Sequence, residues 1–223
     1  MKRAVIIHCW GGYPEYCWYP SVKAELERNG FEVQVPVMPD TDKPKLIEWL
    51  PTLQKVAGEP DENLFLIGHS LGCATIMRYL ESLTSGEKIG GVVFVAGFDD
   101  GLDAEKYPEV QNFFTTPFDY EKIKSRCDKF VAIASDDDPY VPLRYADILK
   151  ERFGAEVTIK HSMKHFSGAA DGEENCVQLP EVVESMLKLA KQKMGRAGCK
   201  PDRRGGGAKK YPQPSFQLSL PPS

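Results

Sequence analysis

The sequence lacks any grouping of cysteines typical of a metal centre or a disulfide framework. The six cysteines are scattered, no two form a C-x-x-C pair, and no H-E-x-x-H segment is present. These absences exclude the common zinc-site patterns, so we expect no metal and no other cofactor. Scattered thiols are typical of reduced proteins, and we therefore expect a cytoplasmic location. The cysteines are Cys9, Cys17, Cys73, Cys127, Cys176 and Cys199.

Long hydrophobic runs are also missing. The first apolar run, 4–7, follows Lys2 and Arg3 but stops at His8, well short of the apolar core of a signal peptide. We therefore expect a first β-strand there rather than a targeting segment. No run is long enough to span a bilayer, so we expect no membrane partner.

Basic residues are outnumbered by acidic ones outside the C-terminal segment. The net charge is −4; residues 195–223 contain six Lys or Arg and one Asp, so they contribute +5 and residues 1–194 contribute −9. An acidic body does not favour nucleic acid as a partner. The segment 195–223 also contains five prolines and a run of three glycines, without an apolar period. We therefore predict a disordered, basic, Gly/Pro-rich tail there.

The remaining residues, 1–194, have the pattern of one α/β domain. Six short and nearly continuous apolar runs predict strands buried on both faces, and helical patterns lie between them. This alternation predicts a three-layer α/β/α sandwich around about six parallel strands. The connection 97–128 is long and rich in aromatic residues, so we expect a small cap segment there. The predicted strands are 4–7, 31–37, 64–67, 92–96, 130–134 and 157–159.

Proline is expected to break one of these helical patterns. The pattern over 45–57 contains Pro51, which lacks the amide hydrogen of a helix interior. We expect Pro51 to end one turn and begin another.

The most informative segment is Gly68-His69-Ser70-Leu71-Gly72. It directly follows a predicted strand and directly precedes a helical pattern. This is the context of a nucleophile elbow, a sharp turn that needs small residues two positions before and after the serine. Such a turn lifts the serine above the sheet with its hydroxyl free. Ser70 is therefore the candidate nucleophile.

A serine nucleophile needs a base, and the base needs a third group that orients it. In this sheet class an Asp or Glu, and then a His, follow the serine along the chain. Asp138 and His165 each follow a predicted strand, at the edge of the sheet where ligands bind in open α/β folds. We therefore predict Ser70, Asp138 and His165 as the catalytic residues.

Neighbouring residues leave alternatives open. Asp138 precedes Pro139, which favours an extended turn, so we prefer it over Asp136 and Asp137, which we expect to be solvated or turn-forming. Among the histidines, His69 lies beside Ser70 but is expected to point elsewhere. The other two, His8 and His161, are expected to shape a loop and to lie at the surface.

Acyl transfer also needs donors for an oxyanion and a pocket for the substrate. The first donor is expected to be the amide of Leu71, and the second an amide of the loop 8–12, which we assign to Trp10, with Cys9 or Gly11 as alternatives. Aromatic residues could line an apolar pocket, although core packing is the competing interpretation of each. The pocket candidates are Trp18, Phe98, Phe114 and Phe166.

The motifs together resemble the α/β-hydrolase fold and, within it, the small serine hydrolases similar to retinoblastoma-binding protein nine. The resemblance implies the same triad, Ser70, Asp138 and His165. The family name also implies binding to the retinoblastoma protein through an L-x-C-x-E segment, but this chain has none, so we do not expect that partner. The similar segments include Ile47-Glu48-Trp49-Leu50-Pro51, Gly68-His69-Ser70, Phe114-Thr115-Thr116-Pro117-Phe118, Ser135-Asp136-Asp137-Asp138-Pro139 and His165-Phe166.

The sequence thus predicts a serine hydrolase that cleaves a small ester, thioester or amide through an acyl-enzyme. The expected partner is a small-molecule acyl substrate, and neither its identity nor the oligomeric state follows from the sequence. The alternative is an interaction protein on a hydrolase fold with weak or vestigial catalysis.

Overall fold

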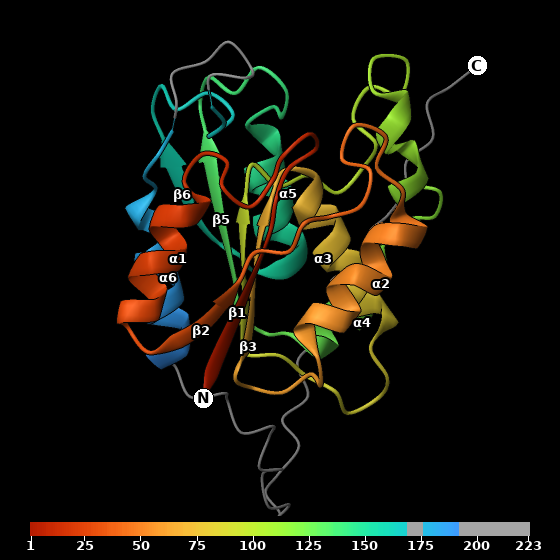
Figure 1. The fold of residues 1–223 in the computed structure, drawn as a ribbon. Helices are drawn as coiled ribbons and strands as arrows, with labels where there is room; N and C mark the ends of the chain where they lie inside the picture. Colours follow the sequence, from red (N-terminus) through yellow and green to blue (C-terminus); the bar gives the residue numbers. More distant parts are fainter. Residues whose placement is uncertain (169–175, 192–223) are drawn as a thin grey trace, which may run out of the picture.

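A computed structural model describes residues 1–168 and 176–191 of the chain. Six parallel strands form one sheet in the order β2-β1-β3-β4-β5-β6 (Figure 1). The predicted number and direction of the strands are therefore confirmed. The strands are β1 (Lys2–Ile7), β2 (Phe31–Gln34), β3 (Leu64–His69), β4 (Gly91–Val95), β5 (Phe130–Ser135) and β6 (Glu156–Lys160).

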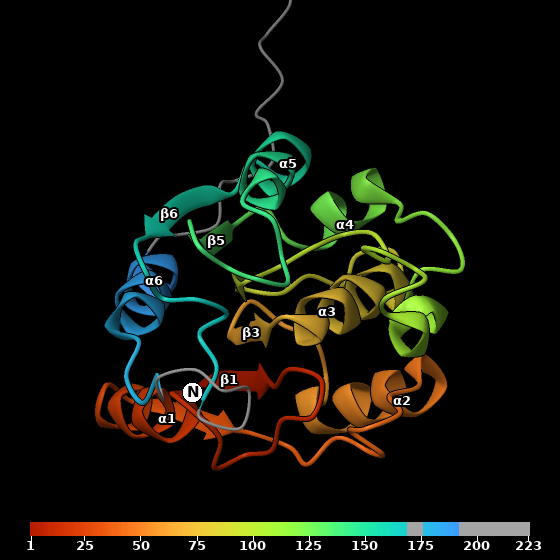
Figure 2. The same cartoon turned by 90° about the horizontal axis from the view of Figure 1, so that it is seen from above.

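Helices cover both faces of the sheet (Figure 2). On one face α1 (Tyr19–Arg28) packs beside α6 (Pro180–Lys191). The other face is covered by α2 (Leu46–Ala57), α3 (Leu71–Ser82), α4 (Tyr120–Arg126) and α5 (Arg144–Phe153). The arrangement is the predicted three-layer α/β/α sandwich.

The two faces of each central strand belong to different hydrophobic cores. Ile7 packs in the core under α2 and α3, whereas its neighbour Ile6 packs in the core under α1 and α6. All residues of β3 and β4 are buried. Burial on both sides explains why these strands are continuous apolar runs rather than alternating ones.

Two local expectations differ from the structure. The second strand ends at Gln34 rather than at residue 37, because β2 is an edge strand that pairs only with β1, over Phe31 to Gln34. Helix α2 is continuous through Pro51 and is not broken there. Pro51 is exposed, so the carbonyl group that loses its helical partner lies on the water side of the helix.

The connection 97–128 contains one 3₁₀ helix, η1 (Pro108–Phe113), before α4. Helix α4 packs against α3 and α5 as an ordinary member of the outer layer. By contrast, η1 contacts the elbow helix α3 and lies toward the end of the molecule at which the strands finish (Figure 1). The first part of the connection is therefore the part that can cover a site at this edge.

Within 1–168 and 176–191, none of the helices has the length and apolar character needed to cross a membrane. The predicted tail over 195–223 lies outside the described residues.

Candidate active site

Ser70 occupies a strained turn between β3 and α3. Its backbone angles are φ 53° and ψ −119°, a region that residues with a side chain seldom adopt. The two glycines of the elbow are sterically required. A Cβ on Gly68 would lie 2.8 Å from the backbone of Cys73, and one on Gly72 would collide with the carbonyl oxygen of Ile7.

Asp138 and His165 are bound to each other at the same edge of the sheet. Nδ1 of His165 lies 2.8 and 3.0 Å from the two carboxylate oxygens of Asp138. The Asp138 carboxylate also accepts the amide hydrogens of Tyr140 and Val141, each at 2.9 Å. Both side chains are buried, at 8% exposure for His165 and 2% for Asp138. Because a carboxylate only accepts, His165 donates from Nδ1, which leaves Nε2 as its basic nitrogen.

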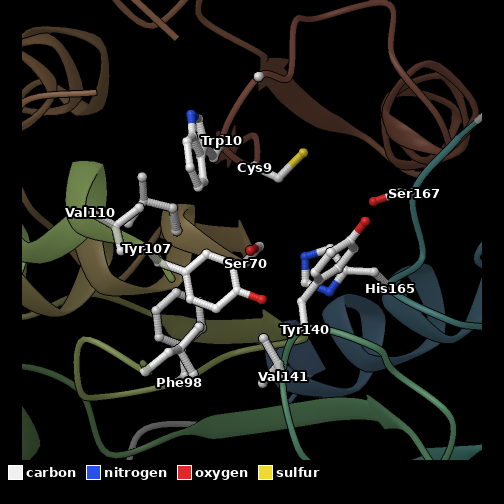
Figure 3. A pocket seen from close by; sticks show the side chains of 13 residues that line it. Cys9, Trp10, Ser70, Phe98, Tyr107, Val110, Tyr140, Val141, His165 and Ser167 are labelled. Atoms are coloured by element: carbon white, nitrogen blue, oxygen red, sulfur yellow. The ribbon is translucent and has the colours of Figure 1, made fainter. Parts of the chain in front are cut away.

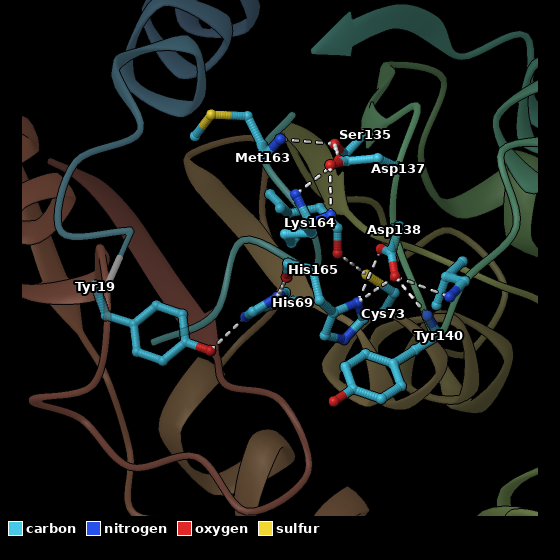
Figure 4. A network of polar contacts seen from close by, with 12 residues as sticks. Tyr19, His69, Cys73, Ser135, Asp137, Asp138, Tyr140, Met163, Lys164 and His165 are labelled. Atoms are coloured by element: carbon cyan, nitrogen blue, oxygen red, sulfur yellow. Dashed lines mark hydrogen bonds and ion pairs between the residues drawn. The ribbon is translucent and has the colours of Figure 1, made fainter. Parts of the chain in front are cut away.

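The other two aspartates, Asp136 and Asp137, have structural partners instead of a catalytic one, and Figure 4 shows those of Asp137. Asp137 accepts from the hydroxyl of Ser135 at 2.8 Å and from the amide of Lys164 at 2.9 Å, and its second oxygen pairs with the Lys164 ammonium at 3.0 Å. These bonds lower the pKa of Asp137 to about 2, with the Ser135 hydroxyl as the largest cause. Asp137 lies in a turn, as expected, and these bonds tie that turn to the Lys164 segment.

Asp136 also bonds to the segment that leads from β6 to His165. It pairs with the ring of His161 at 2.5 Å and accepts the amide hydrogen of Ser162 at 3.1 Å. The His161 bond is the largest cause of the lowered pKa of Asp136. His161 is exposed, as expected from the sequence.

Ser70 and His165 border one cavity of about 310 Å³ (Figure 3). In that view Ser70 lies between an apolar group of side chains that includes Trp10 and Phe98 and a smaller group formed by Cys9, His165 and Ser167. The lining residues are Cys9, Trp10, Gly11, Ser70, Leu71, Phe98, Leu102, Tyr107, Val110, Tyr140, Val141, His165 and Ser167.

Three of the four predicted pocket aromatics lie elsewhere. Phe98 borders the cavity, but Trp18 and Phe166 are fully buried in the core under α1 and α6. Phe114 packs behind Phe98, with ring centroids 5.6 Å apart. These corrections have one cause: an aromatic residue near a site in sequence can face either the cavity or the core.

Several residues that border the cavity were not expected from the sequence. Leu102, Tyr107 and Val110 lie in the connection 97–128, whose aromatic content was the signal for a cap but did not specify which side chains face inward. Tyr140 packs edge-on against the His165 ring, at 5.0 Å between centroids. Tyr140 directly follows Asp138-Pro139 in the sequence, and this position could have indicated that it lies near the site.

Among residues 9–12 of the loop after β1, as far as the structure describes their contacts, only one amide lacks a hydrogen-bond acceptor. The amide of Cys9 donates to the Tyr19 hydroxyl, that of Gly11 to the carbonyl of Thr41, and that of Gly12 to the carbonyl of Cys9. Among the contacts of the described residues, the Trp10 amide has no such acceptor. This pattern favours Trp10 over the two alternatives, Cys9 and Gly11.

The Leu71 amide is available as a donor, and His8 anchors the loop that carries Trp10. The Leu71 amide lies in the first turn of α3, where helix N–H groups have no partner within the helix. His8 is fully buried, accepts the amide hydrogen of Met38 at Nε2, and lies 2.8 Å from the carbonyl of Cys9 at Nδ1. It shapes the loop, as expected.

A parallel sheet with a serine at a strained elbow, and an Asp–His pair at the same edge, defines the α/β-hydrolase class. A profile of the serine hydrolase family matches residues 4–184. The chain belongs to this serine hydrolase family and is an enzyme of the hydrolase class.

Its relatives are small hydrolases of similar length. The chain is 32% identical over 168 residues to YdeN of Bacillus subtilis (strain 168), named a hydrolase, covering 74% of this chain and 86% of that protein. It is 29% identical over 191 residues to serine hydrolase RBBP9 of Rattus norvegicus, covering 84% and 97% of the two chains. The crystal structure of the ydeN product of B. subtilis superimposes with a TM-score of 0.79 at 29% identity, over 86% of this chain and 100% of that one.

Proposed function

We propose that the protein hydrolyses a small acyl compound through a Ser70 acyl-enzyme. The observation that supports this proposal is the buried Asp138–His165 pair, joined at 2.8 Å, beside a cavity that His165 shares with Ser70. A serine hydroxyl becomes a useful nucleophile at neutral pH only with such an oriented base.

The first half of the reaction forms the acyl-enzyme. Nε2 of His165 accepts the Ser70 proton while Oγ attacks the substrate carbonyl carbon, and the carbonyl oxygen becomes an oxyanion. The amides of Leu71 and Trp10 donate to that oxygen. As the tetrahedral intermediate collapses, the bond to the leaving group breaks and the imidazolium returns its proton to that group.

The second half releases the acid. His165 accepts a proton from water, the resulting nucleophile attacks the acyl carbon, and Ser70 leaves with the proton from His165. Asp138 keeps the imidazole in the tautomer that presents Nε2 and stabilises its charged form. The balance of these steps requires water and no redox partner.

The cavity favours a small and uncharged acyl group. Its volume is about 310 Å³, at the lower end of the range for small-molecule pockets. Among the described residues that line it there is no Asp, Glu, Lys or Arg. Phe98, Leu102 and Val110 offer an apolar surface, so an ester, a thioester or a small amide with a short apolar acyl chain fits best.

An open cavity at the serine also counts against the alternative of an interaction protein with vestigial catalysis. Such a protein would be expected to have an occluded site.

The proposal is tested with a fluorophosphonate probe and a panel of p-nitrophenyl esters and aminoacyl-coumarin amides. Labelling is expected in the wild type and absent in Ser70→Ala. Ser70→Ala or His165→Ala should lower turnover by about 10⁶-fold. If a well-folded wild type is neither labelled nor active on any member of the panel, the proposal is wrong.

A further inference from the structure

His69, the variable residue of the elbow, takes no part in the proposed reaction yet lies between two of its components. Its side chain is fully buried. Its Nδ1 lies 2.6 Å from the hydroxyl of Tyr19, and its Nε2 lies 2.8 Å from the carbonyl oxygen of His165 (Figure 4). The Tyr19 hydroxyl in turn accepts the amide hydrogen of Cys9 at 3.1 Å.

The chemistry of the two ends fixes the direction of every hydrogen bond. The Cys9 amide can only donate, and the His165 carbonyl can only accept. All three bonds therefore form when the Cys9 amide donates to Tyr19, the Tyr19 hydroxyl donates to Nδ1 of His69, and Nε2–H of His69 donates to His165. Burial, and secondly the nearby His165, lowers the pKa of His69 well below its ordinary value, which favours the neutral ring that this order needs.

The same geometry excludes His69 as a second base. Both ring nitrogens are engaged within the core, and the ring centroid lies 5.2 Å from that of His165. The two segments that these hydrogen bonds connect indicate a different role for His69. One end is the residue before Trp10, the candidate oxyanion donor, and the other is the backbone of the candidate base.

His165, the candidate base, lies in a segment with a strained backbone. Lys164 and Phe166, the two neighbours of His165, have φ values of 49° and 55°. Residues with side chains are rarely stable at such angles unless surrounding contacts impose them. The bond from His69 is made to the residue between them, so it acts where the backbone strain is concentrated.

The polar side chains of Tyr19 and His69 stand out from their surroundings. Tyr19 and His69 pack in an apolar core beside Trp18, with ring centroids 4.6 and 5.6 Å from it. A buried polar network in such a core is costly unless every member is bonded. Apolar residues of the same size would also take these partners away from the Cys9 amide and the His165 carbonyl. The polar atoms are explained by the two functional segments that they connect.

We propose that Tyr19 and His69 are positioning residues, which hold the oxyanion loop and the His165 loop at a fixed separation on either side of Ser70. This inference rests on the proposed function, because it assigns a role to the separation of the two catalytic segments. The two residues touch no reacting atom. They act through the backbone of Cys9 and of His165.

The test compares Tyr19→Phe, His69→Asn and His69→Gln with a matched control. Tyr19→Phe removes only the hydroxyl. Asn retains a polar group near the former Nδ1 but cannot reach His165, whereas the longer Gln retains a donor near the former Nε2. Tyr79→Phe is the control: Tyr79 lies on the elbow helix, and its buried hydroxyl has no hydrogen-bond partner among the described residues.

Turnover is expressed per active site, counted by fluorophosphonate labelling taken to completion, on the best p-nitrophenyl ester. Tyr19→Phe and His69→Asn are expected to lower kcat by roughly 10- to 100-fold with KM changed less than about 2-fold, because small displacements of catalytic groups cost rate rather than binding. His69→Gln should retain several times the kcat of His69→Asn. Tyr79→Phe should match the wild type.

The outcomes separate this inference from the proposal beneath it. A wild type that is not labelled refutes the proposed function itself. A labelled wild type whose Tyr19→Phe and His69→Asn variants melt earlier but keep kcat per site refutes the positioning role and leaves the proposed function intact. Equal kcat for His69→Gln and His69→Asn, both reduced, also overturns the inference, because the donor to His165 would then have no effect. If His69→Asn does not fold, Tyr19→Phe against Tyr79→Phe decides the question.

Discussion

Asp137 and Asp138 are neighbours with the same side chain, and the partners of each define different tasks. Asp138 bonds the ring of His165, whereas Asp137 bonds the backbone and side chain of Lys164, the residue before the base. The first contact sets the tautomer of the base, and the second stabilises the strained turn that presents it. Substituting each aspartate in turn should therefore distinguish an effect on the catalytic base from an effect on the loop that carries it.

Asp138→Asn should lower kcat by about 10⁴-fold, because an amide no longer fixes the imidazole tautomer or stabilises its charge. Asp137→Asn should cost about 10-fold or less, because it weakens a loop contact and leaves the Asp138–His165 pair intact. Steady-state kinetics on one p-nitrophenyl ester, corrected for labelled sites, gives both values. A crippling Asp137→Asn beside a nearly silent Asp138→Asn would reverse the assignment of the acid.

Asp137 should also contribute to the pH dependence of stability. Its pKa is lowered to about 2, chiefly by the Ser135 hydroxyl and the Lys164 partners, against about 3.9 in an unfolded chain. A lowered folded-state pKa gives stability that is fully present above the unfolded value and is lost as the pH falls from about 4 to about 2. Between these pH values the free energy of unfolding of the wild type should therefore fall more than that of Asp137→Asn, measured by urea denaturation. Parallel pH profiles for the two proteins would contradict the assigned contacts.

The catalytic candidates could be found from the sequence because their positions depend on chain order and strand ends. Asp138 and His165 follow strands that end at the same edge of a parallel sheet, so topology alone brings them together. The pocket side chains depend on rotation about the local backbone instead. Trp18 and Phe166 are as aromatic as Phe98, but they turn into a core that only the packed structure defines.

The elbow is an element whose geometry follows directly from its sequence, whereas α2 is one whose geometry does not. Gly72 is required because the helix after the serine passes against the backbone of β1. For α2, the sequence contains Pro51, but continuity depends on which side of the helix faces water, and that is set by the packing of Trp49 and Leu53 against the sheet layer. Pro51 is thus tolerated within α2 because of how the helix packs on the rest of the molecule, which its own sequence does not reveal.

Gly72→Ala should destabilise the fold more than an ordinary glycine substitution. Its methyl group would collide with the carbonyl oxygen of Ile7, a backbone atom that cannot turn away. We expect a loss of about 3 kcal/mol in the free energy of unfolding, at the upper end of the usual cost of overpacking. The matched control is Gly91→Ala, whose methyl group would meet the flexible side chain of Leu189 at 3.1 Å. Urea denaturation should show a loss at least twice as large for Gly72→Ala, and equal losses would mean that the elbow adapts.

At the scale of the whole molecule, the two helical layers contribute different parts of the candidate site. The layer of α2 to α5 adds the connection 97–128, whose side chains shape the apolar part of the cavity. The opposite layer provides Tyr19, which joins the loop after β1 to the His165 loop through His69. Substrate size is therefore expected to depend on the first layer, and the positions of the catalytic groups on the second.

This division predicts a change in specificity from one side chain. Val110 is buried at the cavity wall, so Val110→Ala should enlarge the space for the acyl chain. The ratio of kcat/KM for p-nitrophenyl hexanoate to that for the acetate should rise roughly 3- to 10-fold, a modest part of what a methylene-sized change in a pocket can produce. Val183→Ala removes the same two carbons from the core under α6, on the other face of the sheet, and should lower stability without changing the ratio. If Val110→Ala leaves the ratio at the wild-type value, the acyl chain does not lie against η1, and the leaving group must occupy that side of Ser70 instead.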